Sequence, residues 1–268
     1  MKSQLDLASN AAIDAGKLAL SMIGKSAVFQ KGASNNLVTE ADTACERMIA
    51  GMIQQQFPQS QILGEEEHKV DNLAAPSLWI IDPIDGTNNF AHGIPQYSVS
   101  IAYAEYGTVL AGAVYDPSMN ELFTAQRGCG AWLNGKPIHV SSVSTMTESI
   151  IATGFYYDRG TMLDNTIKAI YLLFQSNIQC VRRMGSAALD LCYVASGRFD
   201  AYYEYMLSPW DFAAGTLILE EAGGVWSDRE GVQNGLQSRG MICSNKLLDK
   251  EFTDIVRYSG VDTRKIGL

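Results

Sequence analysis

The sequence predicts an α/β fold in which helices and sheets are stacked in layers. Three features support this prediction: a pair of helices at the N-terminus, a run of strands with short turns in the middle, and an alternation of strands and helices after about residue 150. Helices and sheets each have an apolar face to bury, so such a series packs in layers around a hydrophobic core. We therefore expect a layered α/β sandwich with mixed and antiparallel sheets.

Two N-terminal helices are indicated by spacing and by capping residues. Apolar side chains in residues 4–23 recur at helical spacing, at Leu5, Ala8, Ala12, Ala15, Leu18, Ala19 and Met22. A second helix is expected to start at Thr39, because Asp42 three residues later completes a capping-box pattern. It should end near "FPQS", where Pro58 disfavours a helical conformation in the preceding residue.

The middle of the chain is rich in strands. Short apolar and β-branched runs bounded by turn residues predict strands at 78–82, 97–105, 109–115 and 121–125. The breaks between them contain "YG", "DPSMN" and "RGCG", and "LNGKP" predicts a further turn.

After residue 150 strands and helices alternate. Strands are expected at 149–155, 178–183 and 198–206, with helices at 161–176 and 185–196. In the last helix Ser208 is placed to be the N-cap, Pro209 stands at the first helical position, and Gly223-Gly224 marks the end. No repeat or linker interrupts the chain, so residues 1–268 are expected to form a single domain with halves at about 1–150 and 151–268.

Composition and charge narrow the function. The chain has 268 residues, of which 47% are hydrophobic, enough for a large core. Its net charge is −9, from 20 basic and 29 acidic residues, which argues against general nucleic-acid binding. An acidic enzyme can still bind phosphate through metal ions. No segment approaches the roughly 18 apolar residues of a membrane span, so no membrane association is expected.

Cysteine and histidine usage points to a cytoplasmic protein without a zinc site. The five cysteines are odd in number and form no C-x-x-C pair, which is typical of reduced cysteines in the cytoplasm. Asp6 and Asp14 interrupt the N-terminal apolar pattern, so this segment does not resemble a signal peptide. The three histidines are scattered along the chain, which argues against a His-based zinc site.

The stretch "WIIDPIDGTNNF", residues 79–90, carries the strongest chemical signal. Asp82 and Asp85 end a strand that reads as buried, where Pro83 fixes the backbone and Gly86 allows a tight turn. Other acids stand in "ILGEEEHK", which contains Glu65 to Glu67, and at Asp211 in "SPWD". Each also has a plain structural interpretation: a Glu run is usually a solvated loop, and Asp42 and Asp211 could serve only as helix caps.

Convergence of these acids would require a cation. Carboxylates a few ångströms apart cannot all remain ionised without one. Oxygen ligands without Cys or His favour Mg²⁺ or Mn²⁺ over zinc, and two or three such ions about 4 Å apart would form a clamp for phosphoryl chemistry. Thr87 offers a hydroxyl that could orient a water, and the Gly86 and Thr87 amides could bind phosphate oxygens.

The sequence resembles the inositol monophosphatase family of Mg²⁺-dependent, lithium-sensitive phosphatases. The resemblance rests on "WIIDPIDGTNNF" and on five further stretches: "GEE" (64–66), "WDFAAG…LEEAGG" (210–224), "LVTEAD" (37–42), "GSAALDL" (185–191) and "DAYYE" (200–204). It covers nearly the whole chain. It implies an αβαβα layered sandwich, usually a homodimer, and a small phosphorylated polyol or sugar as substrate.

The resemblance also implies metal ligands at matching positions. A first Mg²⁺ would be bound by Glu65, Asp82 and the backbone carbonyl of Ile84. A second would be bound by Asp82, Asp85 and Asp211, and Glu65 would contact a weaker third ion through waters. Glu66, which follows the ligand Glu65, would adjust the loop.

The remaining implied roles concern water and substrate. Thr87, hydrogen-bonded to Asp42, would position the attacking water and help to deprotonate it, with Glu65 as a further catalytic residue. The amides of Gly86 and Thr87 would hold the phosphate. Substrate contacts would come from Gly185, Ser186, Ala187 and Glu204. Glu67-His68 and Asn88 depart from common family residues and bear on substrate preference.

These expectations lead to a specific hypothesis and to rivals. We expect a Mg²⁺-dependent phosphomonoesterase that hydrolyses myo-inositol 1-phosphate by attack of a metal-activated water. The same chemistry could act on fructose 1,6-bisphosphate, 3′-phosphoadenosine 5′-phosphate, NADP or histidinol phosphate. From a different class, the chain could be a regulatory binding protein on a phosphatase fold.

Overall fold

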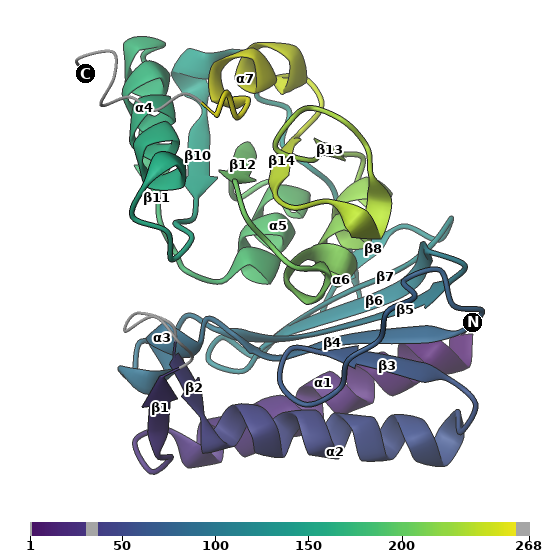
Figure 1. Cartoon of the computed structure of the whole chain (residues 1–268). Coiled ribbons are helices and arrows are strands. Elements are labelled where there is room, and N and C mark those ends of the chain that lie inside the picture. Colours follow the sequence, from purple (N-terminus) through teal and green to yellow (C-terminus); the bar gives the residue numbers. More distant parts are fainter. Residues whose placement is uncertain (1, 31–36, 261–268) are drawn as a thin grey trace.

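The computed structural model describes residues 2–30 and 37–260 and has five layers (Figure 1). Helices α1 (Lys2–Met22) and α2 (Glu40–Gln56) cover the outer face of a seven-stranded sheet. Helices α5 (Ala187–Ala195) and α6 (Pro209–Glu221) lie between this sheet and a five-stranded one. Helices α4 (Thr161–Gln175) and α7 (Asp249–Val256) cover the far face. The predicted αβαβα sandwich is therefore confirmed.

The seven-stranded sheet follows chain order from β3 to β9. Strands β3 and β4 are parallel, and every later neighbour in this sheet pairs antiparallel. Its strands are β3 (Gln61–Gly64), β4 (Leu78–Asp85), β5 (Ser98–Glu105), β6 (Thr108–Asp116), β7 (Glu121–Gln126), β8 (Ala131–Leu133) and β9 (Lys136–Ile138).

The five-stranded sheet is mixed and has the order β11-β10-β12-β14-β13. Strand β10 pairs parallel with β11 and β12, whereas β14 pairs antiparallel with β12 and β13. Its strands are β10 (Ile150–Thr153), β11 (Cys180–Arg182), β12 (Ala201–Glu204), β13 (Val225–Ser227) and β14 (Met241–Ser244). The small elements are β1 (Val28–Gln30), β2 (Leu37–Thr39), α3 (Thr87–Ala91) and 3₁₀ turns at Met146–Glu148 and Gly235–Gln237.

Strand β4 separates two hydrophobic cores. Leu78 and Ile80 belong to the core shared with α5 and α6, while Trp79 and Ile81 belong to the core shared with α1 and α2. This alternation is the two-residue period of a strand that is buried on both faces. By the same period Asp82 faces the layer of α5 and α6, and the site is built there.

The elements predicted by spacing and capping are present, and short elements were missed. Helix α2 has Thr39 as N-cap in a capping box, and α6 has Ser208 as N-cap with Pro209 at its first position. The sequence analysis did not predict β1, β2, β3, α3, β8, β9, β13, β14, α7 or the two 3₁₀ turns, all of which have eight residues or fewer and are too short for a clear periodicity. Every helix within residues 2–30 and 37–260 is too short or too polar to span a bilayer.

A close backbone approach between β6 and α6 generates a stability prediction. A Cβ added at Gly112 would lie 3.1 Å from the Cα and the carbonyl oxygen of Ala214 on α6. Gly51, an exposed position on α2, has no neighbour within 4 Å of such a Cβ. We expect Gly112→Ala to lower the free energy of unfolding by about 1–3 kcal/mol through overpacking. We expect Gly51→Ala to raise it by about 0.5–1 kcal/mol through helix propensity. Urea unfolding of both variants checks the pair, and a neutral Gly112→Ala would contradict close packing here.

Candidate active site

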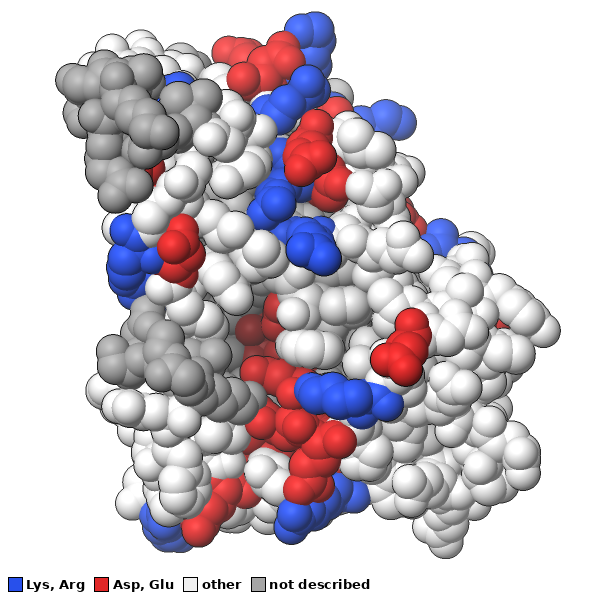
Figure 2. Space-filling view, in the orientation of Figure 1, with Lys and Arg blue, Asp and Glu red and all other residues white. Residues whose placement is uncertain are grey.

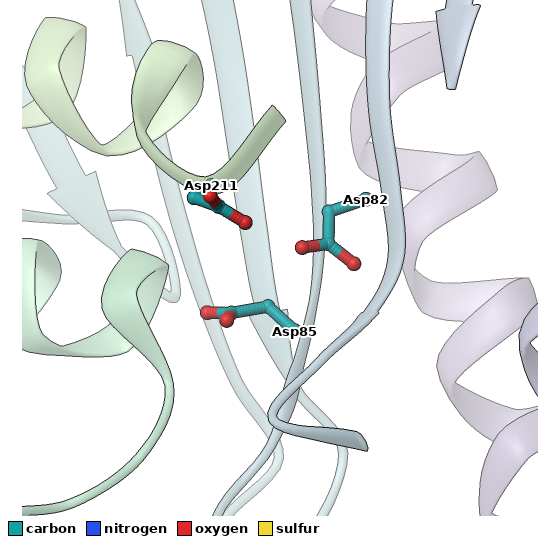
Figure 3. Close-up of side chains that lie close together, drawn as sticks. All are labelled: Asp82, Asp85 and Asp211. Atoms are coloured by element: carbon teal, nitrogen blue, oxygen red, sulfur yellow. The ribbon is translucent and has the colours of Figure 1, made fainter. Parts of the chain in front are cut away.

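Three carboxylates from two distant parts of the chain converge on one space. Asp82 and Asp85 come from β4, and Asp211 comes from the first turn of α6. One oxygen of each lies within 4.8 Å of one oxygen of each of the others. Figure 3 shows the three side chains facing this shared space between β4 and α6.

A bulge in β4 explains how both of its acids reach the same side. Residues three apart on a regular strand point to opposite faces. Asp82 pairs with Ser100 and Asp85 pairs with Ser98, so three steps along β4 match only two along β5. The extra residue turns Asp85 back to the face of Asp82. Pro83 lies inside the bulge, where a residue without an amide proton is tolerated.

Asp85 is anchored by the start of α5. Its Oδ2 accepts hydrogen bonds from the Ser186 hydroxyl at 2.5 Å and the Ala188 amide at 2.7 Å, and its Oδ1 accepts one from the Ala187 amide at 3.2 Å. Burial raises the pKa of Asp85 to about 6, although these hydrogen bonds lower it. The positive end of the helix holds the carboxylate in place.

Asp211 is both a helix cap and a member of the cluster. Its Oδ2 accepts a hydrogen bond from the Ser208 amide at 2.6 Å, which completes the predicted capping box. Burial, followed by the charges of Glu65 and Asp85, raises the pKa of Asp211 well above its ordinary value. Asp211 therefore caps α6 and also lies in the carboxylate cluster.

Asp82 is buried and is repelled by neighbouring carboxylates, including those of Glu65, Asp85 and Asp211. It is 1% exposed, and its Oδ1 accepts a hydrogen bond from the Ile84 amide at 3.1 Å. Burial raises its pKa well above the ordinary value, and the charges of Glu65, Asp85 and Asp211 add to this. Such carboxylates are compatible with ionisation at neutral pH only if a cation lies among them. A donor set made of carboxylate oxygens fits Mg²⁺ or Mn²⁺.

Parallel pairing brings Glu65 to the same site. Gly64 pairs with Ile81, and the Glu65 amide donates to the Ile81 carbonyl at 3.2 Å, so Glu65 follows β3 just as Asp82 follows Ile81. Its half-buried side chain lines the same cavity as the three aspartates. Glu65 lies outside the set whose oxygens are all within 4.8 Å.

Thr87 and Asp42 meet at the edge of the cluster. The Thr87 hydroxyl oxygen lies 3.0 Å from Oδ1 of Asp42 and 3.0 Å from the carbonyl oxygen of Ile84. Oδ2 of Asp42 accepts hydrogen bonds from the Thr39 amide and hydroxyl at 2.8 and 2.6 Å. Burial raises the pKa of Asp42 to about 6. Asp42 therefore caps α2 with one oxygen and contacts Thr87 with the other.

Gly86 is required by both its conformation and its surroundings. Its φ is +99°, a region that disfavours side chains, and a Cβ here would lie 3.1 Å from the carbonyl oxygens of Gln96 and Gly185. The residue precedes α3, whose first amides have no partner within the helix. The predicted tight turn after Asp85 is present.

The acids form one side of a cavity of about 240 Å³. Figure 2 shows acidic side chains gathered in this hollow of the surface. The lining also includes apolar and aromatic residues and one arginine: Phe155, Tyr156, Tyr157, Arg183, Met206, Leu207 and Trp210. Glu204 lies in the same cavity and accepts a hydrogen bond from the Tyr202 hydroxyl at 2.8 Å, and burial raises its pKa to about 7.

Of the predicted substrate contacts, all but Ser186 line the cavity. Gly185, Ala187 and Glu204 line the cavity, as do Gly86 and Thr87. Ser186 does not line the cavity: it is 1% exposed, and its hydroxyl is engaged by Asp85.

The sequence interpretation missed several residues of this region. Tyr157 and Arg183 carry no local pattern that marks them as cavity residues. Glu46, a fully buried acid on α2, could have been noticed because it lies one helical turn after Asp42.

Comparisons with known proteins agree with this geometry. A model of the inositol monophosphatase family matches residues 1–259. An inositol-1-monophosphatase of Synechocystis is 39% identical over 94% of this chain and 88% of that protein. The Nus factor SuhB of Escherichia coli K12 is 42% identical over 82% of each chain. The solved structure of a Thermotoga maritima IMPase has a TM-score of 0.87 and 37% identity, covering 95% of this chain and 96% of that one. The chain therefore belongs to the inositol monophosphatase family of phosphatases.

Proposed function

We propose that this chain is a Mg²⁺-dependent phosphomonoesterase whose leading substrate is myo-inositol 1-phosphate. The observation that carries the proposal is the convergence of Asp82, Asp85 and Asp211 beside the Thr87–Asp42 pair. Metal-requiring carboxylates and a water-orienting hydroxyl at one end of a cavity fit hydrolysis of a phosphate ester.

Glu65, Asp82, Asp85, Asp211 and the Ile84 carbonyl would hold two or three Mg²⁺ ions, or Mn²⁺. Bound there, the ions would make a water molecule more acidic and offset negative charge on the phosphate oxygens. The fit rests on oxygen donors and on the raised pKa of Asp82 and Asp211 in the metal-free chain.

Thr87 and Asp42 supply the means of directing the water. When the Thr87 hydroxyl donates to Oδ1 of Asp42, its lone pairs can accept a hydrogen bond from an attacking water, and a proton lost by that water would pass through the hydroxyl to Asp42. Asp42 is held by Thr39 and has a pKa of about 6, which suits a group that takes up a proton during turnover. A hydroxyl that can orient water, placed beside the carboxylate cluster, favours direct attack by water.

Other groups that line the cavity fit a phosphorylated polyol. The amides of Gly86 and Thr87 would bind the phosphate at the start of α3. Glu204, which lines the same cavity, would accept hydrogen bonds from ring hydroxyls. Fructose 1,6-bisphosphate, 3′-phosphoadenosine 5′-phosphate, NADP and histidinol phosphate are the alternative substrates.

Three further properties belong to the same proposal. Lithium sensitivity and a homodimer are supported by the family resemblance. A cytoplasmic location has a second support, because all five cysteines are free in the structure.

A second candidate function comes from the names of relatives. Proteins called Nus factor SuhB are 38–43% identical to this chain. A regulatory binding role could therefore accompany catalysis or replace it. Replacing the chromosomal gene with a catalytically inactive variant tests this. Cells that behave like the wild type favour the regulatory role, and cells that behave like a deletion mutant favour catalysis.

Asp85→Asn tests the metal assignment. We expect the rate of phosphate release from inositol 1-phosphate at fixed Mg²⁺ to fall roughly 100-fold or more, because a ligand charge is lost. The circular dichroism spectrum should remain that of the wild type. Wild-type activity in this variant, or full rates in EDTA, would contradict the metal mechanism.

The raised pKa values predict how stability depends on pH. A carboxyl whose folded pKa exceeds its ordinary value of 3.8 binds more protons when folded, so the free energy of unfolding of the metal-free chain falls as pH rises through that window, which reaches about 6 for Asp85. We expect Asp82→Asn in EDTA to be more stable than the wild type at about pH 8, with a smaller difference at about pH 5. Mg²⁺ should stabilise the wild type more than the variant at the higher pH. Urea unfolding of both proteins measures these three conditions, and equal stabilities of the two proteins in EDTA at both pH values would refute the argument.

Glu204→Gln tests the substrate assignment. A hydrogen bond to a charged group contributes about 1.5–3 kcal/mol, so kcat/KM for inositol 1-phosphate should fall at least about tenfold. Phenyl phosphate, which has no ring hydroxyls, should be hydrolysed at an unchanged rate. Equal losses on both substrates would argue against recognition of hydroxyls by Glu204. Values of kcat/KM for the wild-type chain on inositol 1-phosphate and on the four alternative substrates rank these substrates.

A further inference from the structure

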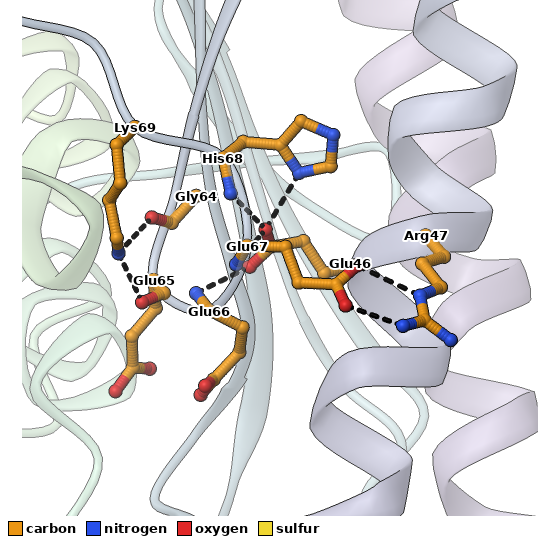
Figure 4. A network of polar contacts seen from close by, with 8 residues as sticks. All are labelled: Glu46, Arg47, Gly64, Glu65, Glu66, Glu67, His68 and Lys69. Atoms are coloured by element: carbon orange, nitrogen blue, oxygen red, sulfur yellow. Dashed lines mark hydrogen bonds and ion pairs between the residues drawn. The ribbon is translucent and has the colours of Figure 1, made fainter.

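A second buried acid on α2 lies behind the loop that carries Glu65. Glu46 is fully buried and lies one helical turn after Asp42, on the same face of α2. Its carboxylate reaches the backbone of residues 66–68 (Figure 4). Burying a charged carboxylate costs free energy unless the carboxylate is well hydrogen-bonded, so the partners of Glu46 show how it is stabilised.

The contacts occupy both oxygens of Glu46. Oε2 accepts a hydrogen bond from the Glu66 amide at 2.7 Å. Oε1 accepts hydrogen bonds from the Glu67 amide at 2.8 Å and the His68 amide at 2.9 Å, and Nδ1 of His68 lies 2.8 Å away. Three consecutive backbone amides therefore point at one carboxylate, which fixes the turn that immediately follows Glu65.

Gly64 shows how closely the loop and the carboxylate fit. A methyl group at Gly64 would overlap the carboxylate of Glu46. Glycine at this position, directly before Glu65, leaves the room in which the Glu46 carboxylate lies against the backbone. The Gly64 amide also donates to the His68 carbonyl at 2.8 Å, which closes the loop on itself.

Lys69 holds the other side of the same loop. Its ammonium group donates to the carbonyls of Gly64 at 3.0 Å and Glu65 at 2.5 Å (Figure 4). It also lies 4.9 Å from the ring centroid of Trp210, the residue before Asp211. The turn that follows Glu65 is therefore bound to α2 through residues 66–68, and Lys69 connects the Glu65 carbonyl to the start of α6.

We propose that Glu46 is a positioning residue for the metal site: it holds the Glu65 turn so that the Glu65 carboxylate is presented to the cations bound by Asp82. This inference rests on the proposed function, because it assigns Glu46 a role in the same metal site. Glu46 acts through the backbone of its neighbours and does not itself line the cavity. Partners that orient metal ligands typically change metal affinity about 10–100-fold when they are lost.

Glu46→Gln is the sharpest test, because it changes one oxygen into an amide group at constant shape. The new amide must face either the Glu66 amide or the pair from Glu67 and His68, so at least one donor meets another donor. The matched control is Asp228→Asn. Asp228 also accepts three hydrogen bonds that hold a loop, from Glu230, Val232 and Asn234, and this loop is outside the cavity lining.

Binding of Mn²⁺ to the whole chain is measured by electron paramagnetic resonance, and the Mg²⁺ requirement of phosphate release is measured in parallel. We expect Glu46→Gln to weaken Mn²⁺ binding about tenfold and to raise the half-maximal Mg²⁺ concentration by a similar factor, with a smaller loss of rate at saturating Mg²⁺. Asp228→Asn should lower the melting temperature and leave both metal measurements unchanged.

Wild-type Mn²⁺ affinity in a folded Glu46→Gln, with only a lower melting temperature, would overturn the inference. Should this variant not fold, His68→Ala decides, since it removes one of the four contacts: a weakening of Mn²⁺ binding of roughly threefold supports the role, and an unchanged affinity refutes it. A wild-type chain that binds no Mn²⁺ would overturn the proposed function itself, and the inference with it.

Discussion

Mutual repulsion among carboxylates that are held away from water is the constraint on which this structure depends. Burial and neighbouring charges raise the pKa of Asp82 and Asp211, so holding these carboxylates together lowers the stability of the folded chain. The chain limits this cost in one recurring way, because each of the four aspartates has at least one oxygen bound to a nearby backbone amide. The pairs are Asp42 with Thr39, Asp82 with Ile84, Asp85 with Ala187 and Ala188, and Asp211 with Ser208. The carboxylates are therefore oriented by the fold itself, and a cation would enter a site that is already shaped.

The five-layer arrangement is what brings these acids together. Strand β4 ends between α2 on one face and α6 on the other, so it can present Asp82 and Asp85 to the inner layer while Ile84 packs in the outer core. The parallel neighbour β3 delivers Glu65 at the same level, as parallel strands end at a common edge. A site with these components needs both sheets and the helices between them, and no single segment could form it alone.

Local signals in the sequence predicted much of this structure. The capping boxes at Thr39 and Ser208 depend on residues three apart, so they could be read directly, as could the strand before Asp82. The acids at positions 42 and 211 had two competing interpretations, and the structure shows that the cap and the site contact coexist. What could not be predicted depends on distant partners. Neither the bulge after Asp82, which is defined by the register with β5, nor the bond between Ser186 and Asp85, 101 residues apart, leaves a local pattern.

Helix α2 has a mechanical consequence for the chemistry. Asp42 contacts the hydroxyl that would aim the water, and Glu46, one turn further along, supports the loop that carries Glu65. A helix is stiff over one turn, so these two side chains move as parts of one body. Any displacement of α2 against the sheet, for example through repacking of Ile49 or Ile53, would therefore move two supports together. One is the contact of Asp42 with the hydroxyl that directs the water, and the other is the contact of Glu46 with the loop that carries the metal ligand Glu65. Selection acting on the packing of one helix would thus tune two components of catalysis together and would have little freedom to adjust them separately.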